Sequence, residues 1–367
     1  MREGWESVTL GDIAHIQQGK RVDHLPIGDE QFPVLGATEI IGSWSSSSYS
    51  EPVIAMGCRG TVGRVRLISE PSWFGNNVMA VFPKESEKLS TSYLGLALSN
   101  TNLEKQGAIG GQVQKQITRK SLFPVKVNIA PLHEQERIVD LMDSVDAAIS
   151  AAQAEVDAAR ELRERVLGHE LGSPGEGWES VTLGDIAHIQ QGKRVDHLPI
   201  GDEQFPVLGA TEIIGSWSSS SYSEPVIAMG CRGTVGRVRL ISEPSWFGNN
   251  VMAVFPKESE KLSTSYLGLA LSNTNLEKQG AIGGQVQKQI TRKSLFPVKV
   301  NIAPLHEQER IVETMNTIDE TVEASRASLY RLRELRSSML SVLLSGEHEI
   351  PATYDQFLEL SDDERAG

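Results

Sequence analysis

The chain has 367 residues, of which 39% are hydrophobic and 23% charged, and its formal net charge at pH 7 is −13. This composition is that of a globular protein with room for two or three domains, and no apolar run approaches the roughly 20 residues that cross a bilayer. The N-terminal residues "MREGWESVTLG" lack the apolar core of a signal peptide, so we expect a cytoplasmic protein that does not contact a membrane.

The chain contains a long internal repeat. Residues 3–139 recur without a mismatch as residues 176–312, so each residue of the first copy has its equivalent 173 positions later. A repeat of this length is a whole domain, because solenoid units have roughly 20 to 50 residues. The segment that follows each copy differs in letters between the two halves but keeps the same apolar spacing.

Short runs rich in valine and isoleucine alternate with turn residues in each copy, namely "FPVLGATEIIGSW", "EPVIAMG", "GTVGRVRLI" and "NNVMAVFPK". They predict a curved, mostly antiparallel sheet. The next run, "STSYLGLALSNTNLEKQG", predicts a helix that Ser90 or Thr91 caps and Gly107 ends. Each copy also holds one cysteine, Cys58 or Cys231, which excludes a disulfide framework or a cysteine zinc site within a copy. The copied unit is expected to be α+β.

The stretch "CRGTVGRVRL" places Arg59, Arg64 and Arg66 around two glycines. Glycines permit a tight turn or a close approach to a ligand, and the arginine fork suits phosphates and guanine edges. The alternative is a glycine-bounded hairpin with solvated arginines. The stretch is not a phosphate-binding P-loop, because it lacks the Gly-Lys-Ser/Thr ending.

The stretch "GAIGGQVQKQITRKSL" places glutamines beside cations. Amides that read base edges next to cations that neutralise phosphates are typical of a DNA-contacting loop, although a plain polar surface loop is the alternative. The serine-rich "IGSWSSSSYSEP" and the asparagines of "FGNNV" are weaker candidates. The predicted DNA-contacting residues of the two copies are Lys20, Arg21, Ser46, Arg59, Arg64, Asn76, Gln112, Gln114, Lys115, Gln116, Arg119, Lys193, Arg194, Ser219, Arg232, Arg237, Asn249, Gln285, Gln287, Lys288, Gln289 and Arg292.

The segments after the copies carry apolar residues at alternating steps of three and four, which predicts two long helices with a coiled-coil seam. Pro131 and Pro304 suit the first turn of each helix. In the second helix the stripe is expected to continue through Leu335, Met339 and Val342. We expect the helices to pack on each other, the alternative being that each packs on its own domain. The predicted seam residues are Met142, Val145, Ile149, Val156, Met315, Ile318, Val322 and Leu329.

The predicted division of the chain is a first domain at 1–130, a long helix at 131–171, a linker at 172–176, a second domain at 177–303, a second long helix at 304–345 and an acidic tail at 346–367. Each copy carries a net charge of only −1, so most of the acidity lies on the helices and the tail. The distribution permits DNA binding by the copies and disfavours it for the helices.

Motifs for catalysis are missing from the sequence. The histidines show no metal-ligand spacing, and there is no Gly-x-Ser-x-Gly elbow, Walker loop, Gly-x-Gly-x-x-Gly or Asn/Asp-Pro-Pro-aromatic tetrapeptide. The sequence therefore predicts a binding subunit without metal or catalytic residues. The rival hypotheses are an enzyme with a degenerate motif, and a dimerising scaffold or carbohydrate-binding repeat that never touches DNA.

The runs "FPVLGATEIIGSW", "EPVIAMGCRGTVGRV" and "FGNNVMAVFPK", and above all "IAPLHEQERIVDLMDSVDAAI" with its repeat "IAPLHEQERIVETMNTIDETV", closely resemble specificity subunits of type I restriction-modification enzymes. The resemblance covers almost the whole chain. It implies two target-recognition domains, separated by two long antiparallel coiled-coil helices with pseudo-two-fold symmetry, that each read half of a split site in double-stranded DNA. It further implies two methyltransferase subunits and motor-nuclease restriction subunits as partners, which would hold S-adenosylmethionine, ATP and magnesium, with no cofactor in this chain.

The sequence departs from the family in one respect. Family members normally carry two different recognition domains and so read an asymmetric bipartite site, whereas the two domains here are identical over 137 residues. The identity predicts an interrupted palindrome as the target.

Overall fold

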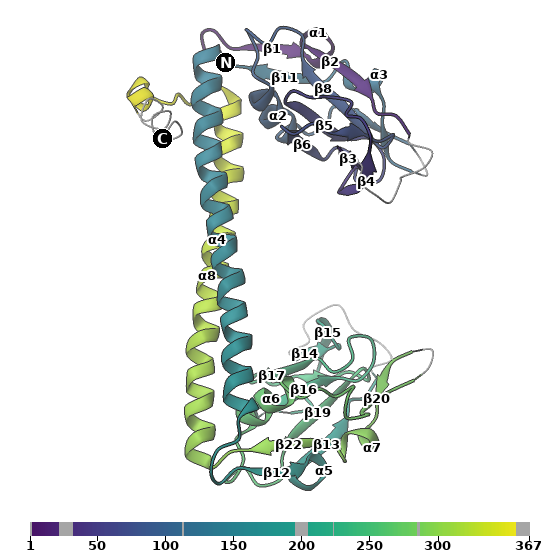
Figure 1. Ribbon diagram of the computed structural model, residues 1–367, viewed down its shortest axis with the longest axis vertical. Helices are drawn as coiled ribbons and strands as arrows, with labels where there is room; N and C mark the ends of the chain where they lie inside the picture. The colour runs from purple at the N-terminus through teal and green to yellow at the C-terminus, as the bar shows by residue number, and fades with distance from the viewer. Residues whose placement is uncertain are drawn as a thin grey trace. The chain divides into compact units, whose positions relative to one another are not determined.

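The structure, a computed structural model, describes residues 2–21, 32–111, 114–194, 205–222, 224–284 and 287–356. The chain divides into two compact units (Figure 1). Unit 1 comprises Met1–Gln153 and Ser328–Gly367, and unit 2 comprises Ala154–Ala327. Each unit therefore contains one copied domain and parts of both long helices.

The elements of unit 1 follow the chain up to the first long helix, α4, which continues into unit 2. They are β1 (Glu6–Thr9), α1 (Leu10–Ile13), β2 (Ala14–Gln18), β3 (Phe32–Leu35), β4 (Ile40–Trp44), β5 (Val53–Gly57), β6 (Val65–Ile68), β7 (Trp73–Phe74), β8 (Val78–Pro83), α2 (Thr91–Ser99), β9 (Ile109–Gly110), β10 (Gln116–Ile117), α3 (Arg119–Leu122), β11 (Lys126–Ile129) and α4 (Leu132–Gly172).

The second copy repeats this order, and the second long helix, α8, returns to unit 1. The elements are β12 (Glu179–Thr182), α5 (Leu183–Ile186), β13 (Ala187–Gln191), β14 (Phe205–Leu208), β15 (Ile213–Trp217), β16 (Val226–Gly230), β17 (Val238–Ile241), β18 (Trp246–Phe247), β19 (Val251–Pro256), α6 (Thr264–Ser272), β20 (Ile282–Gly283), β21 (Gln289–Ile290), α7 (Arg292–Leu295), β22 (Lys299–Ile302), α8 (Leu305–Ser345) and a 3-10 turn, η1 (Ala352–Tyr354).

Each domain is built on a central antiparallel sheet, in the first copy β2-β8-β5-β6, with a smaller sheet, β4-β3-β7, beside it. Successive residues of a strand point to opposite faces. In β5, Ile54 and Met56 pack in the core that includes α2, whereas Val53 and Ala55 pack against the smaller sheet. Both faces of β5 are covered, which explains its uninterrupted apolar run. The mostly antiparallel α+β domain predicted from the sequence is confirmed.

The helix α2 begins as predicted but ends earlier. The side chain of Ser90 accepts a hydrogen bond from the backbone N–H of Tyr93, which caps the helix. The prediction that Gly107 ends the helix is wrong, because α2 stops at Ser99 and Gly107 lies in a later turn with φ +72°. The hydroxyl of Thr101 donates to the carbonyl of Ala97 at 2.7 Å, so a local side-chain bond competes with continuation of the helix.

The helices α4 and α8 run antiparallel within each unit, as their side-chain pairs show. In unit 1, Arg336 pairs with Asp146 and Arg333 donates to Gln153, so the α8 numbers fall as the α4 numbers rise. In unit 2 the same order holds in a second set of pairs, which are Ser325 with Glu155, Asp319 with Arg163, and Arg310 with Glu170. The predicted antiparallel pairing is confirmed in each unit. Neither helix, nor any other in the described part of the chain, is long and apolar enough to cross a membrane.

The buried stripe of α8 departs from the predicted positions near its end. Of the eight predicted seam residues, the structure buries Met142, Val156, Met315, Val322 and Leu329 and half-buries Val145, Ile149 and Ile318. The extension to Leu335 and Val342 is wrong, because these side chains are 49% and 43% exposed. Leu340, Leu343 and Leu344 are buried instead. A helix has 3.6 residues per turn, so a strict 3.5-residue stripe drifts off the contact line over several turns.

A segment after α8, here called the strap (residues 346–356), returns to the start of unit 1. Ile350 is buried in the core of this unit. Asp355 accepts two hydrogen bonds of 2.6 Å from Arg137 of α4, whose side chain is only 7% exposed. In unit 2 the equivalent Arg310 is 55% exposed and pairs with Glu170 of α4 instead. The partner of this arginine is therefore a carboxylate of the strap in unit 1 and a carboxylate of α4 in unit 2.

We expect the substitution Ile350→Ala to lower the free energy of unfolding of unit 1 by roughly 2 kcal/mol, because a buried apolar side chain is lost. Hydrogen exchange checks this on peptides of α4 and α8, whose sequences, unlike those of the copied domains, distinguish the units. Glu349→Ala is the control, since Glu349 is 59% exposed in its pair with Arg2. Equal exchange in the Ile350→Ala and Glu349→Ala variants would contradict the role of the strap.

The contact between the strap and α4 depends on pH. The hydrogen bond from Arg137 lowers the pKa of Asp355. This contact therefore stabilises the fold above the ordinary carboxyl pKa, and its contribution is lost as the pH falls through the lowered pKa.

Candidate nucleic-acid interface

Three connections meet at one end of the central sheet, and together they form a surface called here the loop edge (residues 18–21, 58–64 and 75–77). The register places the end of β2 beside the start of β8, and the end of β5 beside the starts of β8 and β6. The loops that follow or precede these strands therefore lie side by side. Five predicted residues are brought together on this edge although up to 56 positions separate them in the chain, namely Lys20, Arg21, Arg59, Arg64 and Asn76.

The loop edge is joined by side chains that the sequence did not single out. The amide of Gln18 donates to the carbonyl of Asn76 at 2.8 Å and contacts the buried thiol of Cys58 at 3.3 Å. Gly19 is required beside them, because a Cβ at this position would lie 2.2 Å from the carbonyl oxygen of Gly75. The pattern Gln-Gly after a strand is too common to reveal this role.

The three arginines of the hairpin between β5 and β6 have two different roles. Arg59 and Arg64 are exposed on the turn, where Gly60 and Gly63 adopt φ of +76° and +82°. Arg66 is half-buried and donates to the carbonyl of Gly36 at 2.5 Å. Burial, and then the nearby charge of Arg64, lowers the pKa of Arg66. Arg59 and Arg64 are thus available to an anion, whereas Arg66 holds a neighbouring turn.

The hairpin of β9 and β10 joins the loop edge through the backbone, because the N–H of Ile117 donates to the carbonyl of Cys58 at 3.0 Å. Its turn needs Gly111, whose φ is +102° and whose Cβ, if present, would lie 2.1 Å from the carbonyl oxygen of Gln114. Gln114 is exposed at this turn, and Lys115 pairs with Glu104 at 2.8 Å. The hydrogen bond from Lys115 lowers the pKa of Glu104. Lys115 is therefore held in place by an exposed ion pair that a phosphate can replace.

The other predicted residues lie around these loops. Gln116 is half-buried in β10, and Arg119 lies 5.3 Å above the ring of Phe123. Ser46 is exposed and lies two positions after Trp44 in the chain. Gln112 and Gln285 lie outside the described residues. In the second copy Asn249 is half-buried, and the exposed predicted residues are Lys193, Arg194, Ser219, Arg232, Arg237, Gln287, Lys288, Gln289 and Arg292.

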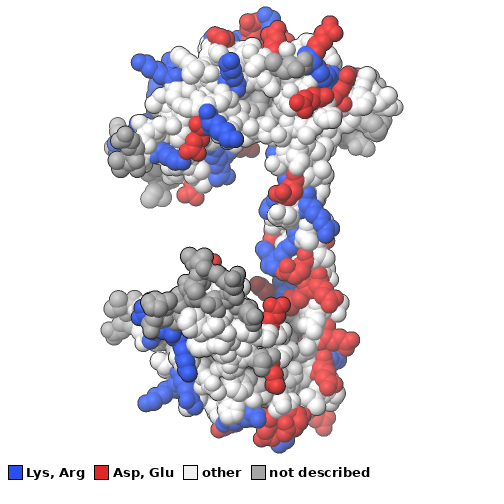
Figure 2. Space-filling model, turned by 180° about the vertical axis from the view of Figure 1, so that it is seen from behind, with Lys and Arg blue, Asp and Glu red and all other residues white. Residues whose placement is uncertain are grey.

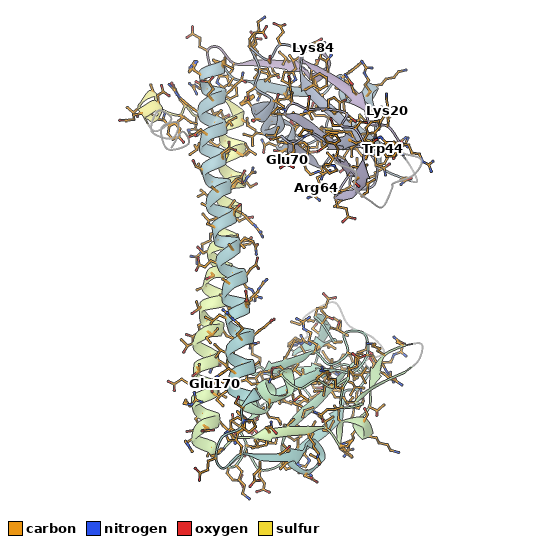
Figure 3. The ribbon with its side chains drawn as sticks, in the orientation of Figure 1. Lys20, Trp44, Arg64, Glu70, Lys84 and Glu170 are labelled. Carbon is orange, nitrogen blue, oxygen red and sulfur yellow. The ribbon has the colours of Figure 1, made fainter. Side chains whose placement is uncertain are left out.

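Charge is unevenly distributed within unit 2. Figure 2 shows acidic side chains gathered along its helices, whereas lysines and arginines lie on the part of the domain away from them. In unit 1, Figure 3 shows Lys20, Trp44 and Arg64 on the domain, with Lys84 on another part of it, where β8 ends. The charge distribution expected from the sequence, near-neutral domains with acidic helices, is compatible with a basic face on each domain.

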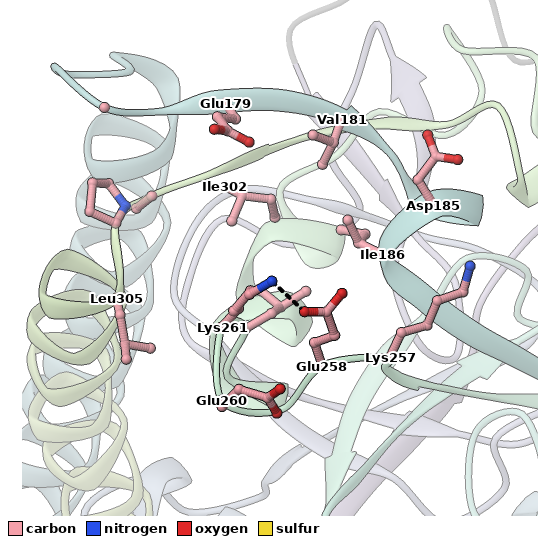
Figure 4. Close-up of a pocket in the computed structure, with 14 residues that line it drawn as sticks. Glu179, Val181, Asp185, Ile186, Lys257, Glu258, Glu260, Lys261, Ile302 and Leu305 are labelled. Carbon is pink, nitrogen blue, oxygen red and sulfur yellow. Dashed lines mark ion pairs between the residues drawn. The ribbon is translucent and has the colours of Figure 1, made fainter.

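A cavity of about 410 Å³ in unit 2 lies away from the loop edge (Figure 4). It is lined by apolar residues that include Val181, Ile302 and Leu305, and an ion pair between Lys261 and Glu258 lies at its side. The corresponding cavity of unit 1 measures about 170 Å³. None of the predicted DNA-contacting residues lines either cavity.

Within the described ranges, no three His, Cys, Asp or Glu side chains are grouped so that they could hold a metal ion. The buried Cys58 contacts Gln18 and the carbonyl of Asn76. The described interface consists of cations, amides and hydroxyls on turns, a set of groups suited to binding an anionic polymer.

Comparison with known proteins relates both halves of the chain to one family. The family described as Type I restriction modification DNA specificity domain matches residues 2–156 and 175–332. The chain is 22% identical over 308 residues to the putative type I restriction enzyme MjaX specificity subunit of Methanocaldococcus jannaschii, covering 74% of this chain and 71% of that protein. It is 20% identical over 413 residues to the MjaVIII specificity subunit of the same organism, covering 94% and 93%.

The chain also shares its fold with solved structures, of which two are described here by their similarity to it. The type I restriction-modification S subunit from M. genitalium superposes with a TM-score of 0.63 at 16% identity, over 95% of this chain and 97% of that one. A chain from a study of complex assembly and conformational transition of the type I system gives a TM-score of 0.61 at 17% identity, over 94% and 98%. Because the family match covers most of both halves, this chain belongs to the type I restriction-modification DNA specificity family.

Proposed function

We propose that the chain is the DNA-recognition subunit of a type I restriction-modification enzyme and that it has no catalytic activity of its own. The observation that carries the proposal is the loop edge, where exposed Arg59, Arg64 and Lys20 meet the exposed Gln114 of the adjoining hairpin. Cations neutralise phosphates and amides read base edges, so one surface supplies both parts of DNA recognition.

The chemistry would belong to partner subunits. The relatives are named as specificity subunits, and one of the similar structures comes from a study of complex assembly in the type I system. Two methyltransferase subunits would bring S-adenosylmethionine, and restriction subunits would bring ATP and magnesium. The purified chain, incubated with S-adenosylmethionine and DNA, should transfer no methyl groups until methyltransferase subunits are added. Transfer by the chain alone would refute the recognition role.

The target would be an interrupted palindrome. One copied domain precedes α4 and the other precedes α8, and these helices run antiparallel in each unit. Equivalent residues of the two domains would therefore contact the same bases on the two DNA strands, which run in opposite directions, as in symmetric dimeric repressors. The site would contain two inverted copies of one half-site around an unread spacer.

We expect methylation mapping, in cells that express the complete enzyme, to find one modified adenine per half-site at symmetric positions on the two strands. Binding to a duplex with the mapped site should weaken when one base pair is added to the spacer, because this turns one half-site by roughly a tenth of a helical turn. The control duplex has an altered spacer sequence of unchanged length. An asymmetric bipartite motif, or direct instead of inverted half-sites, would contradict the proposed arrangement.

A further inference from the structure

Two adjacent isoleucines are exposed in each domain, and this isoleucine pair (Ile40 and Ile41 in the first copy) has no role in the interface described so far. Their exposed fractions are 61% and 47%, and the equivalent residues of the second copy are 60% and 47% exposed. Single exposed apolar residues are ordinary, but neighbouring ones that the fold holds in water suggest a contact surface.

A β-bulge determines how the isoleucine pair is presented. Val34 of β3 lies opposite Gly42 of β4, whereas Leu35 lies opposite Ile40, so Ile41 is the extra residue. A bulge of this kind redirects a side chain that would otherwise follow the alternation of the strand. The same register shift occurs in the second copy.

Ile41 lies against the backbone next to the loop edge. Gly36 is required for this position, because a Cβ there would lie 2.7 Å from the Cγ2 atom of Ile41. The Cδ1 atom of Ile41 also lies beside Gly75, at 3.7 Å from the place of a Cβ on that residue. Gly75 belongs to the turn that carries Asn76. The isoleucine pair is therefore next to the polar residues proposed to bind DNA.

The turn before the isoleucine pair is fixed to the arginine hairpin. Arg66 donates to the carbonyls of Gly36 at 2.5 Å and Thr38 at 3.4 Å, and the hydroxyls of Thr38 and Thr61 are 2.5 Å apart. At the other end of β4, the ring centroids of Trp44 and Trp73 are 6.2 Å apart, and the indole N–H of Trp73 donates to the carbonyl of Lys20. The apolar surface is thus positioned before any ligand binds, which is what a reading residue requires.

We propose that the isoleucine pair reads a thymine in each half-site by contact with its C5 methyl group. The inference rests on the proposed DNA-recognition function. The cations beside the pair favour DNA as the occupant, and the thymine methyl is the apolar group that base edges present in the major groove. The guanidinium group of Arg59 and the amide group of Gln114 bind polar atoms of the bases, so the isoleucines add a discrimination that these groups do not provide.

The test is a scan in which each thymine of the mapped site is replaced by deoxyuridine, which lacks only the methyl group. Binding of the chain, assembled with its methyltransferase partners, is measured for each duplex. We expect one thymine per half-site at which the replacement weakens binding about fourfold. This is the change in affinity expected when one methyl-sized apolar group is no longer buried. Replacement in both half-sites should weaken binding about 15-fold if the two contacts are independent.

The variant Ile40→Ala, combined with Ile213→Ala, should bind the thymine and deoxyuridine duplexes equally. The matched control is Leu67→Ala with Leu240→Ala. Leu67 is 43% exposed but lies opposite Ile54, on the face of the central sheet that α2 covers. This control should keep the full preference for thymine.

The outcomes separate the inference from the function on which it rests. If the parent complex selects its site but deoxyuridine has no effect at any position, or the same effect in the isoleucine variant, the methyl contact is wrong and DNA recognition stands. If the complex does not select any site, the proposed function itself fails. Increased fluorescence of 2-aminopurine on binding, with no dependence on the methyl group, would show a wedge between bases and would also overturn the methyl contact.

Discussion

Replacing Val322 with aspartate is expected to lower the free energy of unfolding of unit 2 by about 3–5 kcal/mol. Val322 is 4% exposed on α8, where the two helices pack within unit 2. A carboxylate there would be buried without a partner, so the helices must separate locally or the group must take up a proton. Urea unfolding followed by circular dichroism measures the loss, and hydrogen exchange of helix peptides assigns it to unit 2.

The matched control for this substitution is Val342→Asp on the same helix. Val342 is 43% exposed, so its replacement should change the free energy of unfolding by less than about 0.5 kcal/mol. A continuous 3.5-residue stripe would make both positions equally sensitive. Equal destabilisation by the two variants would therefore contradict the packing described for α8.

The long helices were predictable because their signals are local. Pro131 and Pro304 suit the first turn of a helix, and the alternation of apolar steps extends over most of both segments. The end of the stripe was not predictable from a heptad count. It depends on how far the drift of an α-helix accumulates against its partner, and Arg336 takes a contact position by pairing with Asp146.

The candidate site was predictable in composition but not in geometry. Residue types suggested that Arg59 and Gln114 could contact DNA, yet no local signal indicated that Arg66 of the same run holds the turn of another hairpin. The exposure of Ile40 and Ile41 follows from a bulge, which depends on strand register. Pairing between distant strands is not encoded in any one segment.

Identical sequence does not guarantee an identical environment. Arg137 and Arg310 occupy the same position in the two copies, but the first is nearly buried against the strap and the second is exposed beside α4. The difference arises because the residue of α8 that corresponds to Glu170 is Leu343, which cannot accept the hydrogen bond. The two units therefore share the bonds that join Trp5 to Glu134 and Trp178 to Glu307 at the start of each helix, but not the partner of this arginine.

Removing the glutamine amide from both recognition loops, by Gln114→Ala with Gln287→Ala, is expected to abolish much of the sequence discrimination. A base-reading amide contributes about 1–3 kcal/mol of discrimination, so each half-site should lose roughly 5- to 150-fold and the whole site the product of both. Competition binding between the mapped site and single-base variants measures the loss. Affinity for unrelated DNA should remain near that of the parent, because Gln114 carries no charge.

Lys115→Ala with Lys288→Ala is the contrasting variant from the same hairpin, one residue along. It should weaken binding to all sequences and reduce the slope of log K against log salt by about 0.9 for each lost phosphate contact, hence about 2 in total. Glu104→Ala with Glu277→Ala should act in the opposite direction, because it removes the carboxylate that holds Lys115 in the free protein. Discrimination should persist in both charge variants. If the glutamine variant discriminates like the parent, or the lysine variant alters site choice instead of salt dependence, the hairpin of β9 and β10 is not the reader.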